Sequence, residues 1–447
     1  MRKIICFFYA IFFISSALKV NAQEAPLERE NSFSLSGQLR SRFEYRHGDF
    51  TPLSKNEEPA ILILNRLRLN LDYAYTDLLK TKITFQNVNI WGQANPLQTL
   101  DKSGNSLSVF EAWADLKIYK NLRTKVGRQT IALDDERLFG ISNWTNSGRS
   151  HDALSFNFEK KKYQISAYFA FNQNYEALNY NNNANNPTGN LYNTTDAQSY
   201  KTMQTLWAKY NMDSYSNLSF LLSNIGFQNA DSLNISNTIN NLQTIGMNYF
   251  FNYPKIYGNI SGYYQLGKSI PEKNTDAYLF SASIGTKIRK DLKFSVGTDY
   301  LSGNTFGKNS ATNHSFQTLF GTGHKFYGNM DYFYAGNQYK DVGLMDNFLK
   351  IQYDIQSKIK VNVDGHLFFA TSDIYTNNRN YSNNLGQEID LSFEFKVNQF
   401  VELSAGYSTY FTSPSLLLLK NVSDAKSYQN WAWLSLYVHP EFFKTIF

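Results

Sequence analysis

The sequence predicts an all-β protein: a transmembrane, antiparallel, up-and-down β-barrel of about 18 strands, with short periplasmic turns and long extracellular loops. Three observations support this fold class. Apolar and polar residues alternate with a period of two, and short and long connections alternate along the chain. Aromatic residues make up 16% of the chain, while no segment after the N-terminus is long and apolar enough for a spanning helix.

The clearest alternation lies in the segments 33–46 and 61–75. In the first, Phe33, Leu35 and Phe43 share one face, and charged residues occupy the other. In a soluble sandwich the polar face would meet bulk water, whereas in a membrane barrel the apolar face meets lipid and the polar face lines a pore. As barrel strands, the two segments would direct five arginines into the lumen: Arg40, Arg42, Arg46, Arg66 and Arg68.

The connections between the predicted strands fall into two classes. Tight turns such as Lys120-Asn121 alternate without a break with long polar stretches such as 131–151 and 302–344. A barrel with short turns at one rim and long loops at the other has this pattern, whereas a Greek-key sandwich is not expected to show it. The predicted strands are 33–46, 61–75, 79–90, 108–119, 122–130, 152–159, 162–171, 201–212, 216–227, 242–251, 255–266, 276–288, 291–301, 345–355, 358–371, 385–397, 399–411 and 430–438.

The two ends of the chain carry further signals. The first 22 residues have the charged start, apolar run and small-residue cleavage site of a secretory signal peptide, with 23–32 as a periplasmic lead-in and 33–447 as the barrel. Cys6 lies in that signal peptide, so the mature chain is expected to contain no thiol. Pro440 interrupts the C-terminal apolar segment, which leaves open which segment closes the barrel.

Charged residues are unevenly distributed over the predicted inward faces. Basic residues dominate the first five strands, whereas later strands mix signs or carry acids such as Asp299, Glu388 and Asp390. A pore wall of one sign concentrates the opposite ion, and arginine binds carboxylates through a planar fork. This favours a path for anionic solutes such as uronate polymers, although the arginines could instead pair with lumen acids and brace the barrel. Four further candidate pore-lining or substrate-binding residues are Lys82, Lys117, Arg123 and Lys125.

Other kinds of site have little support. Without Arg2, Lys3 and Lys19 of the predicted signal peptide the formal charge falls from +6 to +3, which is too small to indicate nucleic-acid binding. No pair of the six histidines has the spacing of zinc ligands, so we expect no metal or cofactor. No Gly-x-Ser-x-Gly elbow is present, although a barrel enzyme could draw catalytic groups from distant strands. Trp113 shares the inward parity of Glu111 and Asp115, so its ring could meet a sugar in the lumen or simply fill space.

Several internal segments resemble the alginate-export family of outer-membrane barrels. The resemblance runs from about Phe33 to Val438 and is most specific just after the fifth predicted strand. The segments that carry it are Val126-Gly127-Arg128-Gln129, Leu133-Asp134-Asp135-Glu136-Arg137-Leu138-Phe139-Gly140, Asn143-Trp144, Gly148-Arg149-Ser150-His151-Asp152-Ala153, His324-Lys325-Phe326-Tyr327-Gly328-Asn329-Met330-Asp331-Tyr332-Phe333 and Gly343-Leu344-Met345-Asp346.

The resemblance implies a monomeric, eighteen-stranded barrel, and the founding activity of the family is export of alginate through an arginine-lined pore. By matching position it adds Arg128 and Arg137 to the candidate pore-lining residues. Arg128 has the outward parity of Val126, and Arg137 lies in the stretch 131–151, which we expect to fold toward the lumen. Because many members are expected to pass other solutes, the resemblance supports the fold better than the substrate.

The sequence therefore predicts a non-enzymatic channel, set in outer-membrane lipid, that moves anionic saccharides or related anionic solutes passively. One alternative is a general porin with little selectivity, and another is a barrel enzyme acting on lipid or glycan. A plugged, ligand-gated transporter is a third, which is disfavoured because no plug-sized domain precedes Phe33.

Overall fold

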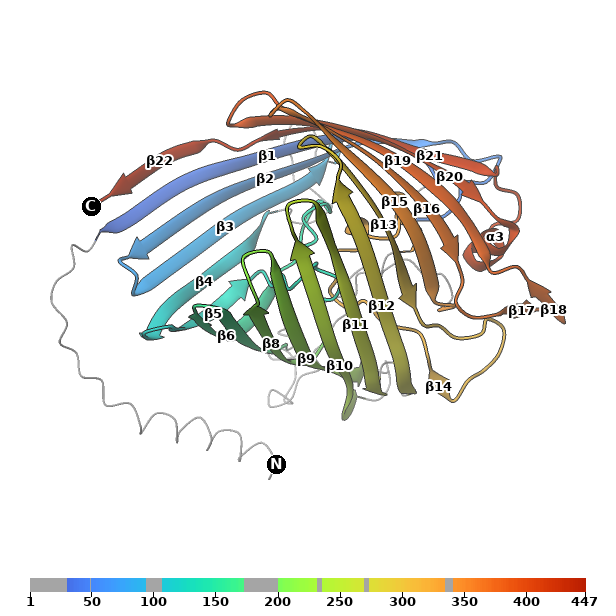
Figure 1. Cartoon of the computed structure of the whole chain (residues 1–447), viewed down its shortest axis with the longest axis horizontal. Helices are drawn as coiled ribbons and strands as arrows, with labels where there is room; N and C mark the ends of the chain where they lie inside the picture. The colour runs from blue at the N-terminus through green and yellow to red at the C-terminus, as the bar shows by residue number, and fades with distance from the viewer. Residues whose placement is uncertain are drawn as a thin grey trace.

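The computed structural model contains a closed antiparallel barrel of 18 strands, as the alternation predicts (Figure 1). Residues 1–22, which the sequence predicts to be a signal peptide, and most of the predicted lead-in lie outside the described part of the chain. The residues that the structure describes are 30–48, 50–93, 107–172, 200–230, 235–268, 273–333 and 341–447.

Each barrel strand pairs with the next one along the wall, and β1 pairs with the C-terminal strands to close the barrel. The barrel strands are β1 (Asn31–His47), β2 (Ala60–Tyr75), β3 (Leu79–Ile90), β4 (Leu107–Tyr119), β5 (Leu122–Gln129), β6 (His151–Lys160), β7 (Tyr163–Phe171), β8 (Thr202–Asn211), β9 (Ser216–Ala230), β10 (Ile235–Asn252), β11 (Ile256–Lys268), β12 (Asn274–Lys287), β13 (Leu292–Leu301), β15 (Leu344–Ile355), β16 (Ile359–Phe369), β19 (Asn384–Lys396), β20 (Val401–Thr412) and β21 (Tyr428–Val438), continued by β22 (Glu441–Ile446). The short elements are β14 (Thr312–Asn313), η1 (Gly323–Lys325), β17 (Ile374–Thr376), β18 (Arg379–Tyr381) and α3 (Pro414–Lys420).

The C-terminal segment closes the barrel in two pieces. β21 pairs with one half of β1 and β22 with the other half, so both segments contribute to closure. Pro440 lies between them and cannot donate a ladder hydrogen bond, but its carbonyl accepts one from the backbone N–H of Gly37 at 3.0 Å. Asn31 and Phe447 then exchange backbone hydrogen bonds of 2.8 and 2.9 Å at the rim.

The two faces of the wall differ as expected for a membrane barrel. On the outer face Phe43 and Leu67 are 40% and 49% exposed, whereas the neighbouring inward side chains of Arg42 and Arg66 are 3% and 1% exposed. A soluble β-protein would bury the apolar set instead. The apolar surface therefore faces lipid, and the polar surface faces the lumen.

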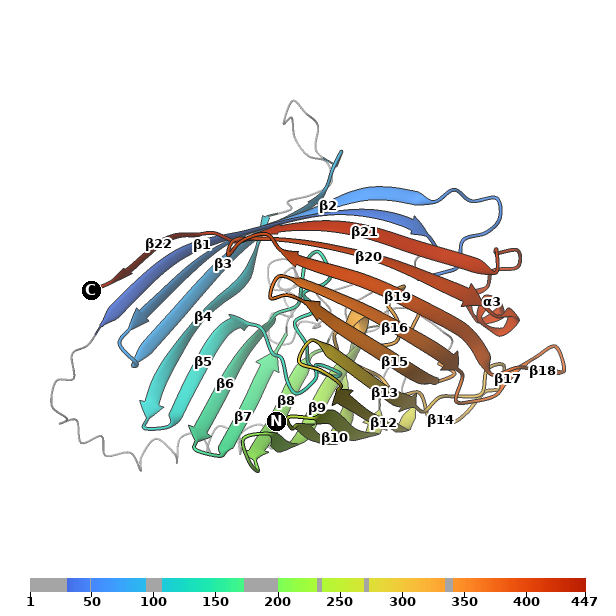
Figure 2. The same cartoon turned by 45° about the horizontal axis from the view of Figure 1, so that its top comes forward.

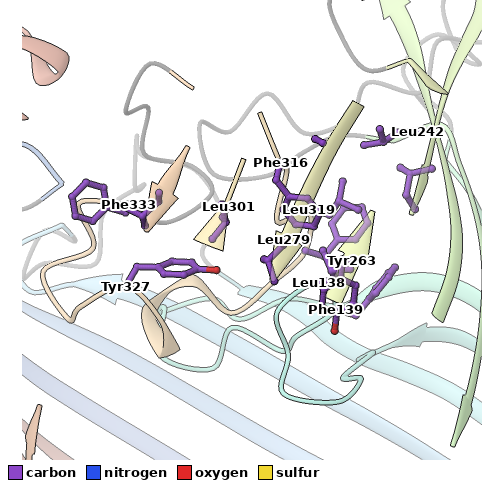
Figure 3. Close-up of a cluster of buried hydrophobic side chains, with 14 of the residues drawn as sticks. Leu138, Phe139, Leu242, Tyr263, Leu279, Leu301, Phe316, Leu319, Tyr327 and Phe333 are labelled. Carbon is purple, nitrogen blue, oxygen red and sulfur yellow. The ribbon is translucent and has the colours of Figure 1, made fainter. Parts of the chain in front are cut away.

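The apolar core lies inside the barrel, where two long loops fold inward (Figures 1 and 2). Inner loop 1 comprises residues 130–150, between β5 and β6, and inner loop 2 comprises the described residues between β13 and β15. The loops pair through a parallel bridge between Phe139 and Phe320, whose ring centroids lie 5.5 Å apart. Leu138 and Leu319 extend this cluster to the wall at Tyr263 (Figure 3). The expectation that 131–151 turns toward the lumen is thus confirmed.

Helix α3 lies between the predicted strands 399–411 and 430–438, where the sequence predicts only a connecting loop. Ser413 caps it by accepting from the backbone N–H of Leu416 at 3.1 Å, Pro414 follows as the first helical residue, and Asn421 ends it in the left-handed conformation. Leu416 and Leu419 are fully buried, and Lys420 at the end of the helix donates to the carbonyl of Tyr332 in inner loop 2 at 2.7 Å.

Candidate functional site

Two neighbouring strands place four arginines on one inner face. Arg40 stands directly opposite Arg66 in the ladder of β1 and β2, and Arg42 and Arg68 lie beside them. All four are buried, between 1% and 9% exposed. Like charges directly across a ladder are destabilising. This arginine wall, defined as Arg40, Arg42, Arg66 and Arg68, therefore requires compensating partners.

Inner loop 1 provides those partners from its backbone. Its residues 143–147, the loop arm, lie against the arginine wall. Arg40 donates from Nη1 to the carbonyl oxygen of Asn143 at 2.7 Å and from Nη2 to that of Thr145 at 2.8 Å. One guanidinium fork thereby holds two backbone carbonyls of the arm at once.

The other strand binds the same arm. Arg66 donates to the carbonyl of Asn143 at 3.2 Å, and Arg68 donates to the carbonyl of Ser147 at 3.1 Å. Among the described residues, no carboxylate lies within ion-pair distance of Arg40, Arg66 or Arg68. Neutral oxygens alone therefore accept the hydrogen bonds of these three cations.

Trp144 connects the arm to inner loop 2. Its carbonyl accepts from Arg42 at 2.8 Å, and the guanidinium of Arg42 lies 4.0 Å from the centre of its ring. The ring also stacks on His324 with a centroid distance of 4.2 Å and an angle of 7°. His324 in turn pairs with Asp331 at 2.9 Å. A single indole thus joins the wall and both inner loops.

Arg42 and Arg46 pair with a lumen acid, as in the alternative in which the arginines brace the barrel. Both pair with the buried Glu44, at 2.6 and 2.7 Å from their Nε atoms. The indole N–H of Trp431 donates to the same carboxylate at 3.1 Å. Glu44 therefore fixes the junction of β1 and β21 and partly neutralises this end of the wall.

A second anchor fastens inner loop 1 to the opposite side of the barrel. The carboxylate of Asp134 accepts from the indole of Trp207 at 3.0 Å, from Ser219 at 2.6 Å and from Asn248 at 2.9 Å, on β8, β9 and β10. Burial raises the pKa of Asp134, whereas the bonds from Ser219 and Trp207 act in the other direction.

Arg137 forms the third anchor. Its guanidinium pairs with Asp135 at 2.7 Å and with Asp299 on β13 at 2.8 Å. Burial lowers the pKa of Arg137, but the two carboxylates outweigh burial and hold the pKa above its ordinary value. Inner loop 1 is thus attached to three separate parts of the wall and crosses the lumen.

Arg149 stands where inner loop 1 returns to the wall. Its Nη1 donates to the carbonyls of Phe320 and, at 3.0 Å, Gly321, and burial lowers its pKa to about 10. It lines two cavities of about 500 and 380 Å³, which also share Ser142 and Thr145. Arg149 and the loop arm therefore separate these two spaces inside the barrel mouth.

The remaining predicted cations lie nearer the short turns and have acidic or aromatic partners. Lys82 lies 3.7 Å from Asp72 and 3.8 Å from Glu111. The ammonium of Lys125 lies 4.3 Å from the ring centre of Trp113, and the indole N–H of Trp113 donates to Glu111 at 3.1 Å. The Trp113 ring therefore faces a cation.

The last three predicted residues are also paired. Lys117 and Arg123 both contact Asp77, at 2.6 and 3.0 Å, and Arg123 binds the carboxylate of Asp115 at 2.8 Å. Arg128 keeps the outward parity of its strand and forms two 2.8 Å bonds to Asp152, at the rim of the larger cavity.

The acidic side of the lumen holds inner loop 2. Glu388 accepts from the backbone N–H of Met330 at 2.7 Å, and Asp390 accepts from that of Asn329 at 3.4 Å. His366 contacts Asp346 at 2.9 Å beside them. The carboxylates of Glu388 and Asp390, which the sequence predicts to face the lumen, therefore bind backbone N–H groups of inner loop 2.

Sequence reasoning placed Arg149 at the return of the loop through the family resemblance, but it did not find the contacts that connect these parts. Trp144, Arg149 and His324 join the arginine wall to the two loops, yet alternation cannot find them because they lie outside the strands. Their one signal is that all three fall in the segments that carry the family resemblance. No group of three or more His, Cys, Asp or Glu within the described ranges could hold a metal ion.

A family model described as alginate export matches residues 31–413, which include the arginine wall, both inner loops and all but the last barrel strand. The chain belongs to the alginate-export family. In the described ranges, no helix is long and apolar enough to cross a membrane. No curated protein sequence matches the chain.

Solved outer-membrane proteins share the fold. The outer membrane protein opdK of Pseudomonas aeruginosa aligns with a TM-score of 0.59 at 12% identity, covering 94% of this chain and 100% of its own. OccAB1 of Acinetobacter baumannii aligns with a TM-score of 0.61 at 10% identity, covering 92% and 97%. Family and fold together indicate an outer-membrane channel for solutes rather than an enzyme.

Proposed function

We propose that the protein passes anionic saccharides of the alginate type, or related anionic solutes, passively across the outer membrane, and that Arg40, Arg66 and Arg68 of the arginine wall form the anion path together with Arg149. One observation carries this proposal. Arg40, Arg66 and Arg68 are held by neutral oxygens alone among the described residues, in a lumen where most other cations have acidic partners.

Carbonyl partners can be exchanged for a better ligand. A charge-assisted bond between a guanidinium and a carboxylate is roughly twice as strong as its neutral counterpart. A uronate carboxylate that reaches Arg40 would therefore compete with the carbonyls of Asn143 and Thr145 for the same fork. The solute would enter as the loop arm gives way, and each arginine would regain the arm after the solute has passed.

Block by oligouronate tests this proposal. We would reconstitute the mature chain in planar bilayers and titrate current block by oligoguluronate and by a neutral oligosaccharide of equal length. We expect saturable block by the uronate alone, weakened about tenfold or more when Arg66→Gln and Arg68→Gln are combined. Arg123→Gln is the matched control, because Arg123 already pairs with Asp77 and Asp115. Equal block in all three proteins would contradict the proposal.

A general porin with little selectivity is the second candidate. The pairing of Lys82, Lys117 and Arg123 with carboxylates favours it, because these cations near the short turns contribute little net charge. That candidate requires an absence of saturable uronate block in the wild-type channel.

A further inference from the structure

The outer face of the barrel carries a polar row where an apolar surface is expected. Gln204 on β8, Asn224 on β9 and Gln243 on β10 are directly paired in the ladder and share the outward parity of Leu206, Leu222 and Ile245. We call Gln204, Asn224 and Gln243 the amide row. Polar side chains on a lipid-facing wall are costly unless they are satisfied, so such a row calls for a ligand or partner.

The amides of the row are hydrogen-bonded to one another, and Asn224 also donates from Nδ2 to Oδ1 of Asn241 on β10 at 3.1 Å, but the row is open at both ends. The Nδ2 of Asn224 donates to Oε1 of Gln204 at 2.6 Å, and the Nε2 of Gln243 donates to Oδ1 of Asn224 at 2.9 Å. Each primary amide has two donors and one acceptor oxygen. Among the described residues, nothing accepts from Nε2 of Gln204 and nothing donates to Oε1 of Gln243. One end thus offers a donor and the other an acceptor.

The row forms one edge of a hollow in the wall. The hollow has a volume of about 550 Å³, and Phe169 and Leu266 bound it at the two ends of the row. Its floor is apolar and consists of the next set of outward residues toward the short turns: Ala167, Leu206, Leu222 and Ile245. No charged residue is among the described residues that line the hollow.

The hollow has an apolar floor beside a polar edge, which matches the apolar chain and polar linkage of a lipid. An acyl chain fits against Leu206, Leu222 and Ile245, which are 44%, 50% and 51% exposed on the membrane-facing surface. The amide row lies on the side of the long loops, toward the outer leaflet, where the linkage between chain and headgroup resides. The open acceptor on Gln243 requires a lipid that can donate at that linkage, which an amide or hydroxyl does and an ester does not.

We propose that this hollow binds one outer-leaflet lipid with amide-linked or hydroxylated acyl chains, the chemistry of the lipopolysaccharide anchor. One chain lies on the apolar floor, and the linkage hydrogen-bonds to the free ends of Gln204 and Gln243. The lack of a cation in the lining disfavours recognition of a phosphate alone. The site lies outside the lumen, so the proposal is independent of the solute that the channel passes.

Native mass spectrometry tests the proposal. The mature chain would be released from detergent in the presence of equal amounts of purified lipopolysaccharide anchor and phosphatidylethanolamine. We expect one tightly retained anchor lipid per chain and about tenfold weaker retention in the Gln204→Leu/Gln243→Leu variant, as the loss of two modest hydrogen bonds implies. Leu206→Trp, which fills the floor, should reduce retention similarly. Leu349→Trp is the control, because Leu349 is exposed on the outer face of β15, away from the hollow.

Two results would overturn the proposal. One is equal retention of the anchor lipid by the wild type, both hollow variants and Leu349→Trp. The other is an efficient disulfide dimer of an Asn224→Cys chain, because the hollow would then be covered by a second copy. Cys6 is the only cysteine of the sequence and lies in the predicted signal peptide, so that test has no background thiol. Heat-dependent mobility in gels and unchanged single-channel conductance confirm that each variant folds.

Discussion

At the scale of single residues, the arginines of this barrel divide by partner. Arg42 and Arg46 share the carboxylate of Glu44, whereas Arg40 and Arg66 bind backbone oxygens of the loop arm. A guanidinium paired with a buried carboxylate is a structural element, because its removal leaves buried negative charge. A guanidinium on carbonyls keeps its charge available to an anion. Identical residue types on one face can therefore serve different purposes.

Arg137 belongs to the structural group, and its replacement should be destabilising. Arg137→Met leaves Asp299 and Asp135 without their cation, and Asp299 is only 1% exposed. We expect a loss of about 3–5 kcal/mol in the free energy of unfolding, measured by urea titration in lipid vesicles. The double variant Arg137→Met/Asp299→Leu should recover much of that loss. If the single variant is as stable as the wild type, Arg137 does not anchor inner loop 1.

At the scale of elements, most strands of the barrel wall could be predicted from the sequence, whereas the elements inside the barrel and helix α3 could not. Alternation and turn spacing located every barrel strand to within a few residues, except that β10 begins at Ile235 and β9 runs on to Ala230. Those extensions are polar, so no apolar period marks them. β22 was missed because Pro440 breaks the strand pattern, although pairing resumes beyond it.

The inner elements depend on contacts between residues far apart in sequence. Arg40 and Asn143 are 103 positions apart, and no local pattern relates them. Some signals were present: Ser413-Pro414 before a run of leucines indicates a capped helix, and Phe316, Leu319 and Phe320 are too apolar for a solvated loop. Helix α3 and the inward fold of loop 2 could have been found from these.

Helix α3 should dock in a pH-dependent way. Lys420 donates to the carbonyl of Tyr332 at 2.7 Å, and burial lowers its pKa to about 7 from an ordinary 10.5. Between these values the undocked helix binds a proton that the docked helix lacks, so docking strengthens as pH rises from 7 toward 10.5. A nitroxide at Val422→Cys should lose mobility between pH 7 and 9. The same label in a Lys420→Met chain should show no such change, and a pH response that persists there would refute this cause.

At the scale of the whole molecule, the protein has an apolar exterior, a polar wall and a second apolar core inside the lumen. Inner loop 1 joins three sides of the wall through Asp134, Arg137 and the loop arm. The apolar core that it forms with inner loop 2 stabilises both loops through packing of buried side chains. We therefore expect passage through the barrel to depend on how firmly the arm is held.

Replacing the arm tests that dependence. A Gly-Ser substitution of 143–147 removes Trp144 with its stacking on His324 and leaves the carbonyls that Arg40, Arg66 and Arg68 bind on a flexible segment. We expect a several-fold larger single-channel conductance with fewer closures, because the flexible linker is no longer held against the arginine wall. The heat-dependent gel shift should remain, since the barrel strands are untouched. Unchanged conductance would mean that the arm does not limit passage.

The most direct test of the central claim, that Arg40, Arg66 and Arg68 form an anion path, is the reversal potential in a salt gradient. The account predicts clear anion preference in the wild-type channel and a large loss of that preference in Arg40→Gln/Arg66→Gln/Arg68→Gln. It predicts no loss in Arg123→Gln/Asp115→Asn, which removes a cation together with its paired anion. If the triple variant and the wild type give the same reversal potential, the carbonyl-bound arginines do not select the solute, and the anion-path account is wrong.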